Sequence, residues 1–168
     1  MQMDRETLIA KVKAAGVIGA GGAGFPTHVK LAGKADTIIV NGAECEPLMA
    51  VDVQLMEGEA QLLAEALAQV VQALNATMGI IALKAKHKAA VRYLEGAFQG
   101  RDGLHLHLLE DFYPAGDEPI LVYEVMGRVV PAGGIPLAVH CLVINVETLR
   151  NIARACQDRP VMTSCLTV

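Results

Sequence analysis

The sequence predicts an α/β protein with a layered, mainly parallel sheet that carries helices on its faces. Short apolar runs typical of buried strands alternate with amphipathic helical segments along the chain. The composition is 53% hydrophobic but only 4% aromatic, so the core must be built from Ala, Val, Leu and Ile. A length of 168 residues suits one domain, and residues 1–168 are therefore predicted to form a single folded unit.

The first part of the chain predicts a helix, a glycine-rich loop and a buried strand. Asp4 can cap a helix that runs to about Ala15, and Gly16 is suited to stop it. After the loop, residues 25–31 predict a further helical turn. The run TIIV at 37–40 is short and apolar throughout, as expected of a strand buried on both faces.

The rest of the chain alternates regularly between the two kinds of element. Apolar residues at spacings of three, four and seven predict one long helix over 52–74. Further strands are predicted at 78–83, 104–109 and 139–144, and further helices at 86–98, at 116–127 and after Asn145. The last residues, 161–168, resemble the start of another strand, which favours a fragment of a longer protein over a natural apolar end.

Charge and cysteine spacing exclude several classes of protein. A net charge of −4 gives no general attraction to nucleic acid, and no apolar run approaches the roughly 20 residues needed for membrane insertion. The polar N-terminus indicates a cytoplasmic protein. The cysteines lack the C-x-x-C spacing of zinc or iron–sulfur sites, so no metal ligand is predicted; they are Cys45, Cys141, Cys156 and Cys165.

The stretch GAGGAGFPTHVK at 19–30 is the first candidate for binding chemistry. Consecutive backbone N–H groups at a helix start attract anions, and Lys30 would add a full positive charge. The stretch is not a P-loop, because Phe-Pro-Thr stands where Gly-Lys-Ser/Thr is needed. It is not a dinucleotide fingerprint either, because it follows a helix and not a strand. A tight interhelix turn with several positive-φ glycines remains the alternative.

Three further polar motifs lie at predicted strand ends or helix starts. NGAECEP at 41–47 follows the first strand, and Glu44 and Glu46 lie on the same side if the segment is extended. These carboxylates could accept hydrogen bonds from ribose or ribityl hydroxyls, or hold a proton, or simply face solvent. YPAGDE at 113–118 and INVET at 144–148 both fit ordinary helix capping.

Taken in this order, the four motifs resemble the FMN-binding domain of the flavoprotein subunit of respiratory complex I. They are more similar still to its relatives of the RnfC and PduS family: the C subunit of Rnf-type electron transport complexes and the propanediol-utilisation cobalamin reductase. A later Gly-Arg-x-Val-Pro at 127–131 adds to the resemblance, which spans roughly residues 10 to 160. It implies an FMN- and NADH-binding domain from the N-terminal part of a longer protein whose later segments carry iron–sulfur clusters.

The resemblance also implies roles for individual residues. The glycines and Lys30 would wrap the flavin mononucleotide and its phosphate, and Asn145 and Thr148 would close the phosphate side. Phe25 and Glu46 would contact NADH, while no catalytic side chain is implied. The implied cofactor-binding residues are Gly19, Gly21, Gly22, Gly24, Lys30, Asn41, Glu44, Glu46, Tyr113, Gly116, Asp117, Glu118, Asn145 and Thr148.

The chain departs from the complex I pattern at four positions. Ala20 replaces an arginine, Ala43 an acidic residue and Cys45 a serine, and Leu31 stands where an aromatic residue helps to stack adenine. These changes leave flavin binding in place but weaken the case for tight NADH binding.

The function implied by the resemblance is electron transfer. FMN would accept hydride from NADH and pass electrons singly to iron–sulfur centres, with other subunits of an electron transport complex or a cobalamin-processing enzyme as partners. The protein would lie in the cytoplasm, peripheral to the inner face of the membrane or within a microcompartment. The alternative is a docking or scaffold domain of such a complex, with weak or no flavin binding.

A third hypothesis concerns His105 and His107. Both are expected on the solvent face of an alternating strand whose leucines 104, 106 and 108 face the other way, where they could bind a metal together with a cysteine. Two histidines alone rarely make a site.

Overall fold

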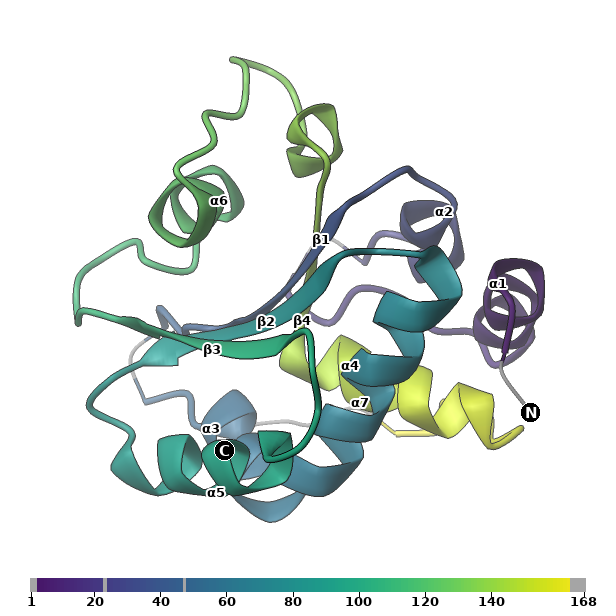
Figure 1. Ribbon diagram of the computed structural model, residues 1–168, viewed down its shortest axis with the longest axis horizontal. Helices are drawn as coiled ribbons and strands as arrows, with labels where there is room; N and C mark the ends of the chain where they lie inside the picture. Colours follow the sequence, from purple (N-terminus) through teal and green to yellow (C-terminus); the bar gives the residue numbers. More distant parts are fainter. Residues whose placement is uncertain (1–2, 23, 47, 164–168) are drawn as a thin grey trace.

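The computed structural model describes residues 3–22, 24–46 and 48–163, and these form an α/β fold around a four-stranded parallel sheet. The strand order is β3-β2-β1-β4, and every neighbouring pair is parallel (Figure 1). The strands are β1 (Thr37–Gly42), β2 (Met78–Lys84), β3 (Leu104–Leu109) and β4 (Cys141–Asn145). The predicted fold class is confirmed, and the carboxyl ends of all four strands meet at one edge.

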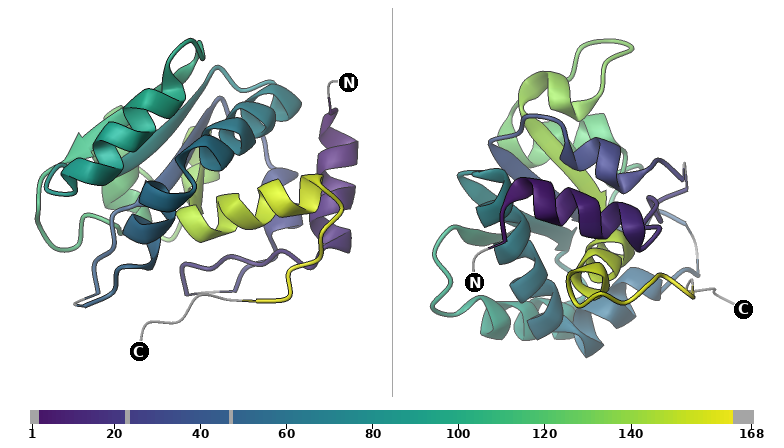
Figure 2. Two further views of the ribbon diagram at one scale, coloured as in Figure 1. Left: turned by 90° about the horizontal axis from the view of Figure 1, so that it is seen from below. Right: turned by 90° about the vertical axis from the view of Figure 1, so that its right-hand side faces the viewer.

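Helices cover the two faces of the sheet unequally (Figures 1 and 2). One face packs against a thick layer that holds the larger hydrophobic cluster. Its helices are α1 (Arg5–Ala14), α3 (Val51–Gly58), α4 (Ala60–Leu74), α5 (Lys88–Phe98) and α7 (Val146–Cys156), and α2 (Thr27–Leu31) lies beside α1. The other face is covered by α6 (Glu118–Met126) and the 3-10 helix η1 (Pro136–Val139), over a smaller cluster.

The apolar run of β1 explains why this strand lies in the middle of the sheet. Ile38 and Val40 point into the larger cluster, whereas Ile39 points into the smaller one, and all three are fully buried. A strand buried on both faces needs apolar residues without alternation. The TIIV motif therefore positions the polar residues that follow it at the centre of the carboxyl edge.

Three helix starts follow from their capping residues. The Asp4 side chain accepts a hydrogen bond from the Thr7 N–H at 2.8 Å, and the Asn145 side chain accepts one from the Glu147 N–H at 2.7 Å. Asp117 caps α6. The predicted capping by Asp4 and Asn145 and within YPAGDE is confirmed, and two of these caps lie beside the carboxyl edge of the sheet.

Two predicted elements have different boundaries in the structure. The helix predicted over 52–74 is wrong as one piece, because the chain turns at Glu59 (φ −126°, ψ 27°) between α3 and α4. The carboxylate of Glu59 pairs with Arg150 of α7 at 3.1 Å, which ties the turn to the neighbouring helix. The strand predicted at 139–144 begins at Cys141, because Pro136 starts the 3-10 turn and His140 ends it at φ 58°.

The ends of the chain add two observations. Residues 161–163 form no strand, and the rest of the strand predicted at 161–168 lies outside the described residues, as does Cys165. None of the helices formed by the described residues has the length and apolar character that a membrane span requires.

Candidate functional site

Two adjoining cavities lie at the carboxyl edge of the sheet, between β1 and β4. After β1 the chain continues to β2 and β3 on one side and returns to β4 on the other, so the direction of strand succession reverses there. Ligands of open α/β sheets bind at such switch points. The cavities have volumes of about 140 and about 530 Å³ and share the walls formed by Gly21, Asn41, Gly116 and Asn145. The larger volume lies within the range of small-molecule sites.

The structure brings together all of the residues that the sequence singled out for binding. The smaller cavity is lined by Gly19, Gly21, Gly24, Phe25, Lys30, Asn41, Gly116, Glu118, Asn145 and Thr148. The larger cavity is lined by Gly21, Gly22, Asn41, Glu44, Glu46, Tyr113, Gly116, Asp117 and Asn145. Segments far apart in the sequence thus converge because each follows a strand or precedes a helix at the same edge.

The glycine loop is fixed by hydrogen bonds at both of its ends. The Gly19 N–H donates to the Phe25 carbonyl at 2.8 Å, and the Ala20 N–H donates to Thr148 Oγ1 of α7 at 2.9 Å. Gly22 has φ +113°, a backbone conformation that is strained for any residue with a side chain, so a glycine is required there. Ala23 lies outside the described residues. The loop backbone is therefore held against the start of α7 with Phe25, 45% exposed, at its rim.

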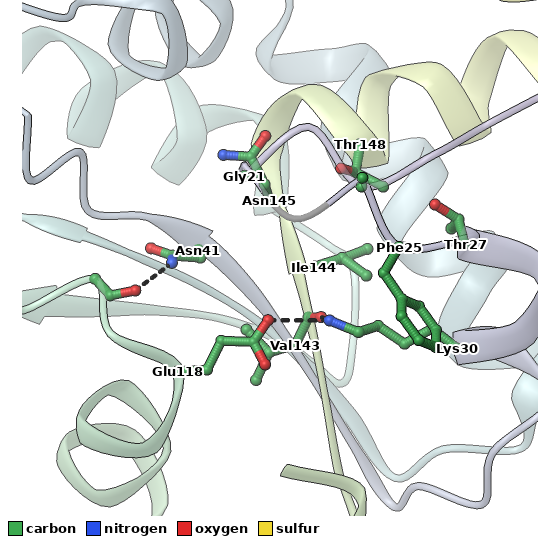
Figure 3. A pocket seen from close by; sticks show the side chains of 13 residues that line it. Gly21, Phe25, Thr27, Lys30, Asn41, Glu118, Val143, Ile144, Asn145 and Thr148 are labelled. Atoms are coloured by element: carbon green, nitrogen blue, oxygen red, sulfur yellow. Dashed lines mark hydrogen bonds and ion pairs between the residues drawn. The ribbon is translucent and has the colours of Figure 1, made fainter. Parts of the chain in front are cut away.

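Lys30 extends across the smaller cavity, as Figure 3 shows. Its Nζ lies 3.0 Å from Glu118 Oε1 of α6 and donates to the Val143 carbonyl of β4 at 2.8 Å. The amino group thus joins the helix on one face of the sheet to the outer strand. It supplies the positive charge of the cavity, and in this structure the Glu118 carboxylate balances that charge.

The loops after β1 and before α6 pack directly against each other. Asn41 Nδ2 donates to the Gly116 carbonyl at 2.8 Å (Figure 3), and Asn41 Oδ1 accepts from the Ala43 N–H at 3.1 Å. The Gly116 N–H donates to Cys45 Sγ at 3.0 Å. A Cβ atom at Gly116 would overlap the Ala43 carbonyl oxygen, so this contact requires glycine. The Asn41 amide is thereby held facing the cavities.

A buried acidic group forms part of the larger cavity's wall. Asp52, which is only 6% exposed, accepts a hydrogen bond on Oδ2 from Asn145 Nδ2 at 2.7 Å. Its backbone N–H donates to Glu44 Oε1 at 3.0 Å, so Glu44 caps α3. Burial, followed by the charge of Glu44, raises the pKa of Asp52 to about 7 even though the Asn145 hydrogen bond opposes the shift.

Sequence reasoning missed several residues of the walls. The strongest omission is Asp52, for which the only signal was a carboxylate at the start of an otherwise amphipathic helix. Thr27 also lines the smaller cavity, and its Oγ1 is buried without a hydrogen-bond partner among the described residues. Ala20, Ala43 and Cys45, which the sequence marked only as departures from the complex I pattern, also line the larger cavity, and the residues missed altogether are Thr27, Met49, Val51, Asp52, Pro114, Val143, Ile144 and Glu147.

Leu31 and Tyr113, two positions considered for contact with a ligand ring, lie in different surroundings. Leu31, taken from the sequence as a lost adenine-stacking position, is fully buried in the larger hydrophobic cluster and does not line either cavity. Tyr113 lies at the rim of the larger cavity and is 80% exposed. Among the described residues, Phe25 and Tyr113 are the aromatic residues that line the two cavities.

The histidine pair of β3 lies apart from these cavities. Leu104 and Leu106 pack into the larger cluster as expected, but Leu108 is 48% exposed because it lies near the end of an edge strand. His105 is exposed and His107 half-buried. Among the residues that the structure describes, no three His, Cys, Asp or Glu side chains are grouped closely enough to hold a metal.

The chain is similar in sequence to a cobalamin reductase and to a subunit of an ion-translocating oxidoreductase complex. The chain is 46% identical over 166 residues to the cobalamin reductase PduS of Citrobacter freundii, a match that covers 98% of this chain and 36% of the relative. It is 35% identical to the C subunit of the Na⁺-translocating ferredoxin:NAD⁺ oxidoreductase complex of Acetobacterium woodii, over 91% of this chain and 35% of that relative. The chain thus spans about a third of the length of these curated relatives.

A solved structure and a family description agree with these relatives. A crystal structure of an NAD⁺-reducing [NiFe]-hydrogenase in the air-oxidized state superimposes with a TM-score of 0.76 and 28% identity, covering 89% of this chain and 30% of that one. Residues 12–154, most of the chain and all four motifs, match the family described as the Nuo51 FMN-binding domain. The chain therefore belongs to the family of Nuo51 FMN-binding domains.

Proposed function

We propose that the chain is an FMN-binding electron-transfer module that accepts hydride from NADH and passes electrons to iron–sulfur centres outside residues 1–168. The observation that carries this proposal is the convergence of the four motifs on two cavities with common walls. Family membership supports the flavin, and the names of the relatives, a cobalamin reductase and a ferredoxin:NAD⁺ oxidoreductase component, support the redox role.

The residues present fit a flavin mononucleotide. A phosphate needs N–H donors and a cation, which the glycine loop and Lys30 supply on a chain whose net charge is −4. Ribityl hydroxyls need small polar partners, and the buried Thr27 Oγ1 in the wall of the smaller cavity has no hydrogen-bond partner in the part of the chain that the structure describes. Buried polar atoms of this kind are normally satisfied, so a hydroxyl-rich ligand suits them.

FMN, when bound, supplies two-electron acceptance from the nicotinamide and one-electron release. The chain's own part is to bind and to orient. Asn41 and Asn145 present amides whose orientation is fixed by hydrogen bonds to Gly116 and Asp52. Glu46 and Phe25, both exposed at the cavities, are proposed to orient NADH. No side chain of the site needs to act as a nucleophile.

The setting of the module is proposed from the same relatives. The chain would be one domain of a longer protein, with other subunits of an ion-translocating oxidoreductase complex or a cobalamin-processing enzyme as partners. Its site of action would be cytoplasmic, peripheral to the membrane through those partners or within a microcompartment.

A second candidate function is a docking domain with weak or no flavin binding. The observation in its favour is that the Lys30 amino group already has Glu118 and the Val143 carbonyl as partners, while Ala20 provides no second cation. In that case the folded scaffold, and not the cavity, would be what the complex uses.

Visible absorbance of the purified chain distinguishes the two functions. The chain is mixed with FMN, freed of excess flavin and then titrated anaerobically with NADH. We expect a retained flavin band that bleaches on addition of NADH. A retained band that NADH leaves unchanged would remove the hydride-accepting role, and a folded chain that retains no flavin would favour the docking function instead.

A further inference from the structure

We propose that Asp52 is a positioning residue that works as a neutral carboxylic acid and shares one proton with Glu44, so that these two side chains together carry one negative charge instead of two. The consequence for FMN rests on the proposed function, whereas the proton itself is a property of the folded chain. The inference starts from the contacts that surround this side chain.

The contacts around Asp52 leave one buried acceptor, Glu44 Oε2, without a donor among the described residues. Asp52 Oδ2 accepts from Asn145 Nδ2, and Asn145 Oδ1 accepts from the Glu147 N–H, so the orientation of the amide is fixed from both ends. Glu44 Oε1 accepts from the Asp52 N–H, but Glu44 Oε2 is buried without a partner among the described residues. A protonated Asp52 has an O–H to donate, and Glu44 Oε2 is an acceptor that needs one.

The charges around Asp52 favour the neutral form. Burial acts first and the charge of Glu44 second, with a smaller contribution from Glu147, and together they raise the pKa of Asp52 to about 7. The Glu44 carboxylate accepts from the Asp52 backbone N–H, so it lies close to the buried Asp52 side chain, and two neighbouring carboxylates do not both ionise readily. The shared proton is therefore expected to persist up to about neutral pH.

Two basic residues lie on the elements around this wall. His87, before α5, interacts with Glu44, but burial and two neighbouring lysines lower its pKa, which favours the neutral imidazole near pH 7. On α7, Arg150 pairs with Glu59 at the turn between α3 and α4. The charged groups on the elements around Asp52 are thus Glu44, Glu147, His87, Arg150, Glu59 and, through His87, Lys84 and Lys86.

Ionisation of Asp52 would add a negative charge to a cavity proposed to hold the phosphate-bearing FMN. The expected effect is a loss of FMN affinity as pH rises through neutrality. Asp52→Asn imitates the neutral acid, because its amide oxygen still accepts from Asn145 and its NH₂ group can donate to Glu44. Asp52→Ala removes both interactions.

The first measurement needs no ligand: the free energy of unfolding of the wild-type chain, Asp52→Asn and the control Asp102→Asn as a function of pH. A folded-state pKa raised above the ordinary 3.8 gives stability that is present below pH 4 and lost as pH rises to about 7. We expect Asp52→Asn to lose less stability over this window than the wild type. The exposed Asp102 lies outside the cavities, and its variant is expected to follow the wild type. Parallel curves for wild type and Asp52→Asn would overturn the shared proton.

The second measurement is the FMN dissociation constant of the wild type, Asp52→Asn and Asp52→Ala between pH 6 and 8.5. We expect the wild type to weaken about 5- to 10-fold relative to Asp52→Asn over this range, as expected for one added charge at the wall of a cavity. A ratio that stays constant with pH would overturn the coupling, and equal affinities of Asp52→Ala and Asp52→Asn would overturn the positioning role. If none of the chains binds FMN, the proposed function and this coupling both fail, while the unfolding curves still decide the shared proton.

Discussion

At the residue scale, Lys30 contacts two layers of the molecule through one amino group. It pairs with Glu118 on α6 and donates to the Val143 carbonyl on β4, and its side chain is largely buried. We expect a phosphate that enters the cavity to take the place of the Glu118 carboxylate, whose side chain is 41% exposed and can turn to solvent. Lys30 is therefore the residue at which affinity for an anion should be most sensitive to substitution.

We predict that Lys30→Met lowers FMN affinity about 10- to 100-fold, because a charge-assisted hydrogen bond contributes roughly 1.5–3 kcal/mol. Fluorescence titration of FMN measures the change. Lys34→Met removes the same charge from an exposed position away from both cavities and should leave the affinity nearly unchanged. Equal losses in the two variants would mean that the attraction is a general effect of net charge.

Gly116 offers a second test at this scale. A Cβ there would overlap the Ala43 carbonyl oxygen and lie 3.0 Å from Cys45 Sγ. We predict that Gly116→Ala costs roughly 1–3 kcal/mol of stability, as overpacking of a close contact does, and weakens flavin binding by moving Asn41. Denaturant unfolding gives the first quantity.

The matched control for that change is Gly96→Ala. Gly96 lies in α5 with open space around its Cβ position, and alanine there should stabilise the helix by roughly 0.5–1 kcal/mol. A Gly116→Ala chain as stable as Gly96→Ala would show that the two loops are not packed as described.

At the element scale, the residue that caps α7 also forms a hydrogen bond with the acidic residue Asp52. One oxygen of Asn145 caps the helix, and its NH₂ group faces Asp52. The element is thus held by a residue that must donate as well as accept. Aspartate is an equally good cap in general, but it cannot donate once it is ionised.

We predict that Asn145→Asp is destabilised much more at pH 8 than at pH 5, because the new carboxylate lies against Asp52 beside Glu44. Asn145→Ala loses the cap, about 1 kcal/mol, and the hydrogen bond to Asp52, but it adds no carboxylate and should therefore show a smaller pH dependence than Asn145→Asp. Thermal unfolding at the two pH values separates the two effects. A pH-independent penalty for Asn145→Asp would contradict the proximity of the carboxylates.

The features that could be predicted from the sequence are those determined by residues close together in the chain. The strands and the caps of Asp4 and Asn145 follow from apolar runs and from side-chain chemistry within a few residues. The break at Glu59 was not predictable, since it is accompanied by a pair with Arg150, 91 residues away. Asp52 was missed for the same reason: its burial depends on where α3 meets the start of α7.

At the scale of the whole molecule, the two faces of the sheet differ in how much they bury. The layer with α4 and α7 holds the larger cluster, whereas α6 contributes only Leu121 and Val122 as buried residues over the smaller one. The face covered by α6 and η1 buries fewer apolar residues, so local unfolding of these two elements should cost less free energy than local unfolding of α4 or α7. Glu118, which lines the smaller cavity, is the first residue of α6.

We predict that backbone amides of α6 exchange with solvent at least 10-fold faster than those of α4, because local opening there exposes less apolar surface. Hydrogen exchange followed by mass spectrometry of peptides covering 118–126 and 60–74 measures the difference. Saturating FMN should slow exchange in 118–126 selectively. Uniform exchange of the two peptides would contradict an independently opening cover.

The hydrogen bond from Lys30 to Val143 has a consequence for self-association. Within the described residues β4 has a strand neighbour on one side only, and the open side of an edge strand can pair with another chain. The lysine occupies one main-chain carbonyl of that strand and places a positive charge beside it. The group proposed to receive a phosphate is therefore also a hydrogen-bond donor to an edge strand, and the oligomeric state of Lys30→Met, measured by size-exclusion chromatography, tests whether its loss lets a second molecule extend the sheet.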